Sequence, residues 1–243
     1  MSIEEIIEKS FNDLIKAITT DGTSSQLIFP YSNNDDERHS EQELRQIFLR
    51  NVEEEKTYFY SIETPTKYGY RFKDSKNLEV DKNHKKGEHK AAWFDVSLYT
   101  ENTIQSLASC IEFKHNNPDE KKGICKDFLK LAKEVNFTKE NKNFFVHYHY
   151  VEKKTGWESR SFESIFGKYR NSVDYIENLL ENKNDLSKVI VYLVCIHGKE
   201  KSALTYHFSL ADLKDKYKIG TKYKDLTDKS WLNEKIFNTK NSI

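Results

Sequence analysis

A five-residue stretch, residues 110–114 (CIEFK), combines a carboxylate and an ammonium group with apolar neighbours. Side chains alternate between the two faces of a β-strand, so Glu112 and Lys114 share one face. Ile111 and Phe113 share the other face, where they can enter a hydrophobic core. The pattern predicts a strand with one polar, chemically capable face.

A second stretch lies upstream at residues 93–99 (WFDVSLY) and carries one carboxylate, Asp95. The same alternation places Asp95 and Ser97 on one face and the apolar side chains on the other, namely Phe94, Val96 and Leu98. If the two strands pair in one sheet, Asp95, Glu112 and Lys114 converge on one polar patch beside the core.

The chemistry that uses such a trio is the hydrolysis of phosphodiester bonds. Two carboxylates from neighbouring strands bind a hard divalent cation such as Mg²⁺ and leave positions for water and phosphate. The cation neutralises charge that develops in the transition state and lowers the pKa of a water molecule. Lys114 can orient that water or stabilise the transition state, and lysine suits this role because its charge is compact.

A plainer interpretation of Glu112 and Lys114 is a pair of opposite charges on an exposed strand. An E-x-K triplet arises often by chance in a chain so rich in lysine. Three features favour a site: Asp95 lies 17 residues upstream, the stop sequence 116–118 (NNP) follows the triplet, and a helix-like segment comes next.

These residues resemble a known family. Asp95, followed by the 111–114 segment (IEFK), a helix and a strand, is similar to the PD-(D/E)xK, or restriction-endonuclease-like, nuclease superfamily. The expected order of elements over residues 40–151 matches the α-β-β-β-α-β core of that superfamily. The resemblance covers less than half of the chain, and Phe94 stands where the motif has Pro. It implies a nuclease that uses Mg²⁺, with Mn²⁺ as a substitute, in which Asp95 and Glu112 are metal ligands and Lys114 is the catalytic base or stabiliser.

Many members of the superfamily place a further acidic residue on the first core helix, near the metal. The candidates here are Glu41 and Glu43. The sequence from Ser40 to Glu43 reads as a capping box, which would use Glu43 on the backbone. Glu41 lies three residues before Leu44, close to the buried stripe of the helix, and we favour it as the additional ligand.

Four residues near the motif are candidates for contacts with nucleic acid. Lys126 and Lys130 are about one turn apart on the helix after the motif and could bind a backbone phosphate, although exposure to solvent explains them as well. His115 and Asn116 follow the motif directly and could touch substrate. A strand that simply ends in a loop accounts for them equally.

Hydrophobic spacing predicts the elements that must position these residues. Helices are expected at residues 2–19, from residue 40 onward, at 124–135 and at 162–180. Strands are expected at 57–64, 92–99, 107–113, 144–151, 188–197 and 204–210, with 68–72 returning as the hairpin partner of 57–64. This order favours an α/β or α+β fold with a restriction-endonuclease-like core: a central mixed sheet flanked by helices.

The chain divides into three expected segments. Residues 1–37 form an N-terminal helix and loop, residues 38–155 the nuclease core, and residues 156–243 a C-terminal α/β extension packed on the core.

Composition narrows the class of protein. The chain has 243 residues with 39 basic and 39 acidic side chains. Residues 1–56 carry a net charge of −7, so the remainder carries +7, which allows a basic face without a basic protein. No segment has the length of a membrane span. The first residues lack the basic region of a signal peptide, and three cysteines form no disulfide or zinc pattern, which predicts a cytoplasmic protein with no membrane partner.

The sequence therefore favours a Mg²⁺-dependent deoxyribonuclease, an endonuclease rather than an exonuclease, with nucleic acid, most naturally DNA, as its partner. Restriction or defence against foreign DNA is the role that the resemblance implies, and homodimerisation would serve cleavage of both strands. The alternative is a non-catalytic protein on the same fold, which binds nucleic acid or regulates a partner.

Overall fold

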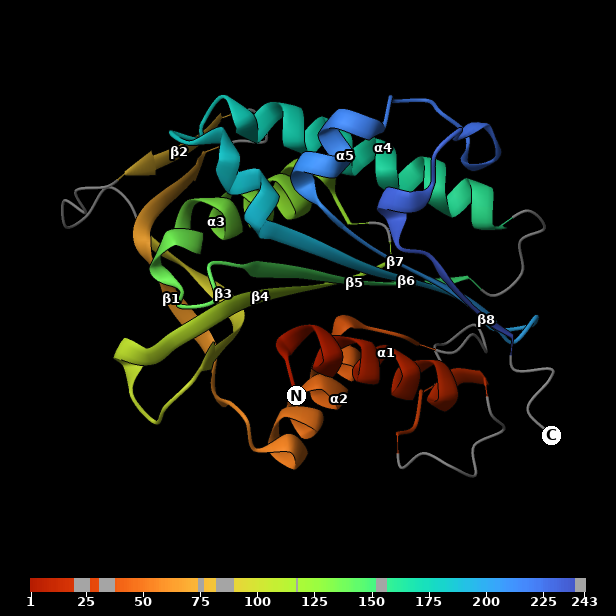
Figure 1. The fold of residues 1–243 in the computed structure, drawn as a ribbon, viewed down its shortest axis with the longest axis horizontal. Coiled ribbons are helices and arrows are strands. Elements are labelled where there is room, and N and C mark those ends of the chain that lie inside the picture. Colours follow the sequence, from red (N-terminus) through yellow and green to blue (C-terminus); the bar gives the residue numbers. More distant parts are fainter. Residues whose placement is uncertain are drawn as a thin grey trace.

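The described part of the chain forms one continuous mixed β-sheet with helices on both faces (Figure 1). The computed structural model describes residues 1–19, 27–30, 38–73, 77–81, 90–116, 118–151 and 157–238. The sheet has the strand order β2-β1-β3-β4-β5-β6-β7-β8; β5 is parallel to β4 and β6, and the other neighbouring pairs are antiparallel. The strands are β1 (Phe59–Lys73), β2 (Asn77–Asp81), β3 (Lys90–Tyr99), β4 (Leu107–His115), β5 (Asn143–Val151), β6 (Val189–His197), β7 (Ser202–Ser209) and β8 (Lys235–Asn238).

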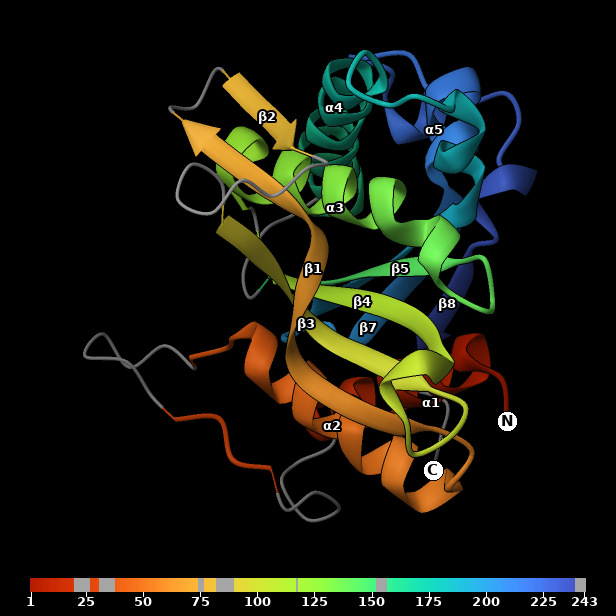
Figure 2. The same cartoon turned by 90° about the vertical axis from the view of Figure 1, so that its left-hand side faces the viewer.

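Helices α1 and α2 lie against one face of the sheet, and α3, α4 and α5 lie against the other (Figures 1 and 2). This arrangement confirms the expected α/β class with a mixed sheet between layers of helices. The helices are α1 (Ile3–Thr19), α2 (Glu41–Glu55), α3 (Lys126–Glu134), α4 (Trp157–Glu177) and α5 (Leu210–Lys216).

Two hydrophobic cores result, one on each face of the sheet. The inner strands β5 and β6 are buried along almost their whole length because helices cover both of their faces. Helix α1 contributes a stripe of buried side chains at three- and four-residue spacing, which buries the helix against α2 and the sheet.

Helix α2 begins where its sequence predicts. Ser40 is the N-cap, and its Oγ accepts a hydrogen bond from the backbone N–H of Gln42 at 3.3 Å. The carboxylate of Glu43 accepts the backbone N–H of Ser40 at 2.7 Å and its hydroxyl at 2.6 Å. This capping box fixes the first turn of the helix, on which Glu41 lies.

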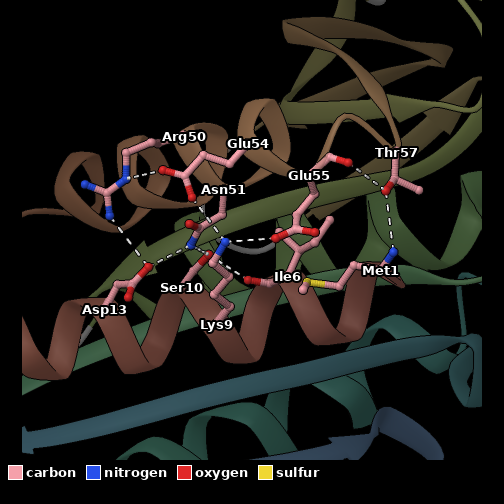
Figure 3. Close-up of polar contacts among 10 residues, drawn as sticks. All are labelled: Met1, Ile6, Lys9, Ser10, Asp13, Arg50, Asn51, Glu54, Glu55 and Thr57. Atoms are coloured by element: carbon pink, nitrogen blue, oxygen red, sulfur yellow. Dashed lines mark hydrogen bonds and ion pairs between the residues drawn. The ribbon is translucent and has the colours of Figure 1, made fainter.

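Polar side chains clamp α2 to α1 (Figure 3). The amide of Asn51, fully buried, donates to Ser10 Oγ and to Asp13 Oδ2, both at 3.1 Å. Lys9 adds an ion pair with Glu55 at 2.9 Å at the other end of the contact. These buried hydrogen bonds fix the register of the two helices, so α1 holds α2 in place against the sheet.

The predicted hairpin between residues 57–64 and 68–72 is wrong. Both segments belong to the single strand β1, which bends between Pro65 and Gly69 and continues to pair with β3 and then with β2. The bend is stabilised from α3, because the Glu134 carboxylate accepts the backbone N–H groups of Lys67 at 2.8 Å and Tyr68 at 2.9 Å. With these groups satisfied, the strand can bend without reversing.

The expected core and the expected C-terminal extension share one sheet, and helix α1 of the expected N-terminal segment packs on that sheet. The C-terminal residues add β6, β7 and β8 to it, and the N-terminal helix reaches the last strand through an ion pair of 2.6 Å between Glu8 and Lys235. The loop expected before residue 38 lies largely outside the described residues. Within the described ranges, no helix is both long enough and apolar enough to cross a membrane.

Candidate active site

Strands β3 and β4 pair as predicted, and their pairing stops at the expected site. The antiparallel register runs from Tyr99 and Leu107 to Val96 and Ile111. The next position along this register places Asp95 opposite Glu112. There the Asp95 side chain replaces the backbone as acceptor: its Oδ2 accepts the N–H of Phe113 at 2.7 Å. The Asp95 carboxylate therefore lies against the peptide unit that joins Glu112 to Phe113.

The sheet is irregular on the other side of Asp95 as well. Glu63 of β1 lies across from Asp95 and has a positive φ of 52°, a conformation that is uncommon for a residue with a side chain. As a result the alternation of β3 changes at Asp95. Phe94 enters the core under α3 and α4, whereas Val96 and Leu98 enter the core under α1 and α2. The expectation that these three share one face is wrong because this irregularity shifts the alternation by one residue.

The alternation predicted for β4 is confirmed. Ile111 and Phe113 enter the core with α1 and α2, and the two charged side chains point to α3. Glu112 is 2% exposed, and its Oε1 lies 2.5 Å from Lys130 Nζ. Lys114 Nζ lies 2.9 Å from Oδ2 of Asp127. Helix α3 therefore supplies a partner to each charged residue of the motif.

Lys130 joins three elements of the fold. Besides Glu112 of β4, its Nζ contacts Asp127 Oδ1 on α3 at 2.9 Å and the backbone carbonyl oxygen of Trp93 on β3 at 2.8 Å. The three protons of the ammonium group thus have three oxygen acceptors. Since the Lys130 side chain is only 2% exposed, it is a buried cation inside the site.

The additional acidic residue is placed by the first turn of α2. Glu43 is committed to the capping box, as the sequence predicts. Glu41 is partly buried, and burial raises the pKa of its carboxyl group, which feels the charges of Lys114, Asp95 and Asp127. Glu41 therefore belongs to the electrostatic neighbourhood of the motif residues, and α2 and α3 contribute to the site from opposite faces of the sheet (Figure 2).

The site is rich in negative charge. It holds the carboxylates of Glu41, Asp95, Glu112 and Asp127 and two ammonium groups, a formal sum of −2 when all six are charged. Burial raises the pKa of Glu112 well above its usual value, and the nearby Asp127 raises it further. Burial alone would lower the pKa of Lys114, but Asp127, Glu112 and Asp95 together raise it above its usual value.

A hard divalent cation fits the chemistry of these donors. Asp95 Oδ1 and Glu112 Oε2 accept no hydrogen bond from the described residues, so each motif carboxylate keeps one oxygen for a ligand. Mg²⁺ is commonly held by one or two carboxylates, with water and substrate phosphate completing its shell. Within the ranges that the structure covers, no three His, Cys, Asp or Glu side chains lie close enough to hold an ion as they stand. The residues therefore suit a two-carboxylate site rather than a closed protein cage.

The residues predicted to contact nucleic acid have different surroundings. Lys130 is buried and paired, so it is not placed to meet a phosphate from solvent, and that expectation is wrong. Lys126 is partly exposed on the first turn of α3. Its role toward nucleic acid stays a prediction.

His115 and Asn116 end strand β4. The backbone of Asn116 has a φ of 56°, its N–H donates to the carbonyl of Tyr148 at 2.7 Å, and its side-chain oxygen accepts from the N–H of Tyr150 at 3.1 Å. These contacts give Asn116 a structural role. The His115 ring packs at 5.0 Å from the Tyr148 ring, and burial lowers its pKa to about 4.

Two residues of the site were missed by the analysis of the sequence. Asp127 was not considered, and Lys130 was assigned to an external phosphate. Together with Glu134 they follow a spacing of three and four residues along α3, which puts all three on one side of the helix. All three are buried, so the helix carries a charged stripe toward the sheet. That spacing is visible in the sequence. It indicates a buried network of charged side chains only when the helix is also known to be buried.

Comparisons with protein-family models, with curated proteins and with solved structures find no match to this chain.

Proposed function

We propose that this protein is a metal-dependent nuclease that hydrolyses phosphodiester bonds, with Asp95, Glu112 and Lys114 at its catalytic centre. The observation that carries the proposal is the break in pairing between β3 and β4. It sets the Asp95 carboxylate against the Glu112–Phe113 peptide at 2.7 Å and leaves one oxygen of each acid for a ligand. Carboxylates from adjacent strands, beside a buried lysine, are the groups that phosphodiester hydrolysis with a hard cation requires.

Each residue has a distinct task in this proposal. Asp95 and Glu112 hold the cation, Mg²⁺ or Mn²⁺, and Glu41 adds negative charge from α2. The bound ion would supply positive charge for the transition state and lower the pKa of the attacking water. Lys114 carries a proton, because its carboxylate neighbours raise its pKa, so it acts by charge on the phosphate oxygens rather than as a base.

DNA is the proposed polymer, and cleavage within the strand is the proposed mode. Both come from the resemblance of the motif to restriction-endonuclease-like enzymes, as does a role in restriction or defence and a homodimeric state. Lys126, which lies beside Asp127 on the first turn of α3 and is partly exposed, is the lysine proposed to meet a backbone phosphate.

The experiment is a panel of substrates and metals. Supercoiled plasmid, linear duplex, single-stranded DNA and RNA are each incubated with Mg²⁺, Mn²⁺ or EDTA, using the parent chain and Asp95→Asn. We expect cleavage of a DNA substrate with either ion, none with EDTA, and none by Asp95→Asn. Binding of nucleic acid without cleavage under every condition would contradict the proposal and identify the alternative, a non-catalytic binding protein.

A further inference from the structure

We infer that Lys130 is a built-in cation that takes the place of a second divalent ion, so that the catalytic site binds one metal ion and no more. The inference rests on the proposed function and specifies its metal requirement. Two-metal nucleases hold their ions about 3.5–4 Å apart between shared carboxylates. Here an ammonium group stands between two of the carboxylates.

The surroundings of Lys130 Nζ are those of a bound cation. Its neighbours are the carboxylate of Glu112 at 2.5 Å, the carboxylate of Asp127 at 2.9 Å and the carbonyl oxygen of Trp93 at 2.8 Å. Carboxylate and backbone carbonyl oxygens are the ligands that hard divalent ions prefer. They come from β4, α3 and β3, so Lys130 crosslinks the same elements that a structural ion would join.

Burial keeps this cation in place. The Lys130 side chain is 2% exposed, and those of Asp127 and Glu112 are 4% and 2% exposed. A lysine in such a place has no solvent to move into, and its departure would leave two buried carboxylates without a counter-charge. A second metal ion would have to displace it against both penalties.

Asp127 is excluded as a ligand of the single ion. One of its oxygens contacts Lys130 at 2.9 Å and the other contacts Lys114 at 2.9 Å. Asp127 is therefore a positioning residue for both lysines. The ion is left with Asp95 and the second oxygen of Glu112, and Glu41 adds negative charge at the edge of the site.

The test counts Mn²⁺ ions on the full-length chain without measuring cleavage. Titration calorimetry and electron paramagnetic resonance are applied to the parent, Asp95→Asn, Lys130→Ala and Lys133→Ala. We expect one ion on the parent that Asp95→Asn abolishes, two ions on Lys130→Ala, and one ion on Lys133→Ala. Lys133 is the matched control because it is a lysine of the same helix, paired at 3.4 Å with Glu181.

If Lys130→Ala does not fold, electron paramagnetic resonance of Mn²⁺ bound to the parent protein provides the test by itself. An isolated Mn²⁺ spectrum at saturation supports a single ion, whereas the signal of a coupled Mn²⁺ pair would overturn the inference and leave the nuclease proposal standing. One ion on folded Lys130→Ala would also overturn it. No Mn²⁺ binding that depends on Asp95 would instead contradict the proposed function itself.

Discussion

The ammonium group of Lys114 lies 2.9 Å from Asp127, in a site where carboxylates outnumber lysines. Its environment decides between the two roles that the motif allows. A general base must lose its proton near neutral pH, but the surrounding carboxylates raise the pKa of Lys114. We therefore propose that Lys114 acts as a positive charge, which Asp127 holds in place.

At the same scale, the His115 ring makes stability depend on pH. Burial lowers the pKa of His115 to about 4 from its usual 6.5, with His39 and His149 nearby as further obstacles to protonation. Between pH 6.5 and 4 the unfolded chain then binds a proton at this position and the folded chain does not. His115 therefore does not reduce the free energy of unfolding above pH 6.5, but it lowers that free energy progressively as the pH drops from 6.5 toward 4.

We therefore expect His115→Gln to flatten this dependence. Urea unfolding measured at pH 7, 6 and 5 should show that the free energy of unfolding falls less with decreasing pH in the variant than in the parent. The slope of that free energy against pH should differ by at most the binding of about one proton. The variant and the parent losing stability in parallel over this range would show that His115 is not the group that titrates.

At the scale of the elements, α3 organises this part of the molecule. Asp127 and Lys130 reach the candidate active site from it, and one further turn along the same side Glu134 holds the bend of β1. The same helix thus determines both the charge of the site and the path of the strand beside it. A buried charged stripe of this kind is tolerated because each member has partners.

Glu134→Gln tests the link between helix and strand. The Gln amide keeps one oxygen acceptor and replaces the other oxygen with an NH2 donor. One of the two backbone N–H groups, that of Lys67 or that of Tyr68, then loses its acceptor. We expect the free energy of unfolding to fall by about 1–3 kcal/mol in urea titrations. Glu181→Gln is the control, since its side chain is 62% exposed and its change should stay within about 0.5 kcal/mol. If Glu134→Gln were as stable as the control Glu181→Gln, the bend of β1 would not depend on the Glu134 carboxylate.

The sequence predicted those elements whose signals are local. Ser40 and Glu43 form a capping box within four residues, and Glu112 and Lys114 alternate with buried neighbours inside one strand. The change of face at Asp95 was not predictable, because it depends on Glu63 in another strand. The hairpin failed for a related reason: the bend of β1 is stabilised by Glu134, 66 residues away from Tyr68.

At the scale of the whole molecule, one sheet joins the expected core to the C-terminal residues, and helix α1 of the N-terminal segment packs on that sheet. The residues expected to form the core contribute α2, strands β1 to β5 and α3, and strands β6 to β8 extend the same sheet. Helix α1 packs on α2 and is tied to β8 by the ion pair between Glu8 and Lys235. The N-terminal helix and the C-terminal strands therefore support the helix that carries Glu41.

The central claim is that Lys114 acts beside Asp95 and Glu112 in metal-dependent cleavage. The most direct measurement is the rate at which plasmid is cut with Mg²⁺ by the parent, Lys114→Ala and Lys139→Ala, all purified identically. Lys139 is the matched control, because its side chain is 50% exposed and its acidic neighbour Glu101 lies 3.9 Å away at the surface.

We expect Lys139→Ala to cut at the parental rate and Lys114→Ala to be slower by a factor on the order of 10²–10³. Circular dichroism and Mn²⁺ titration should show that Lys114→Ala remains folded and still binds one ion. Cleavage by Lys114→Ala at the parental rate would contradict the account, because the activity would then belong to another site or to a contaminating nuclease.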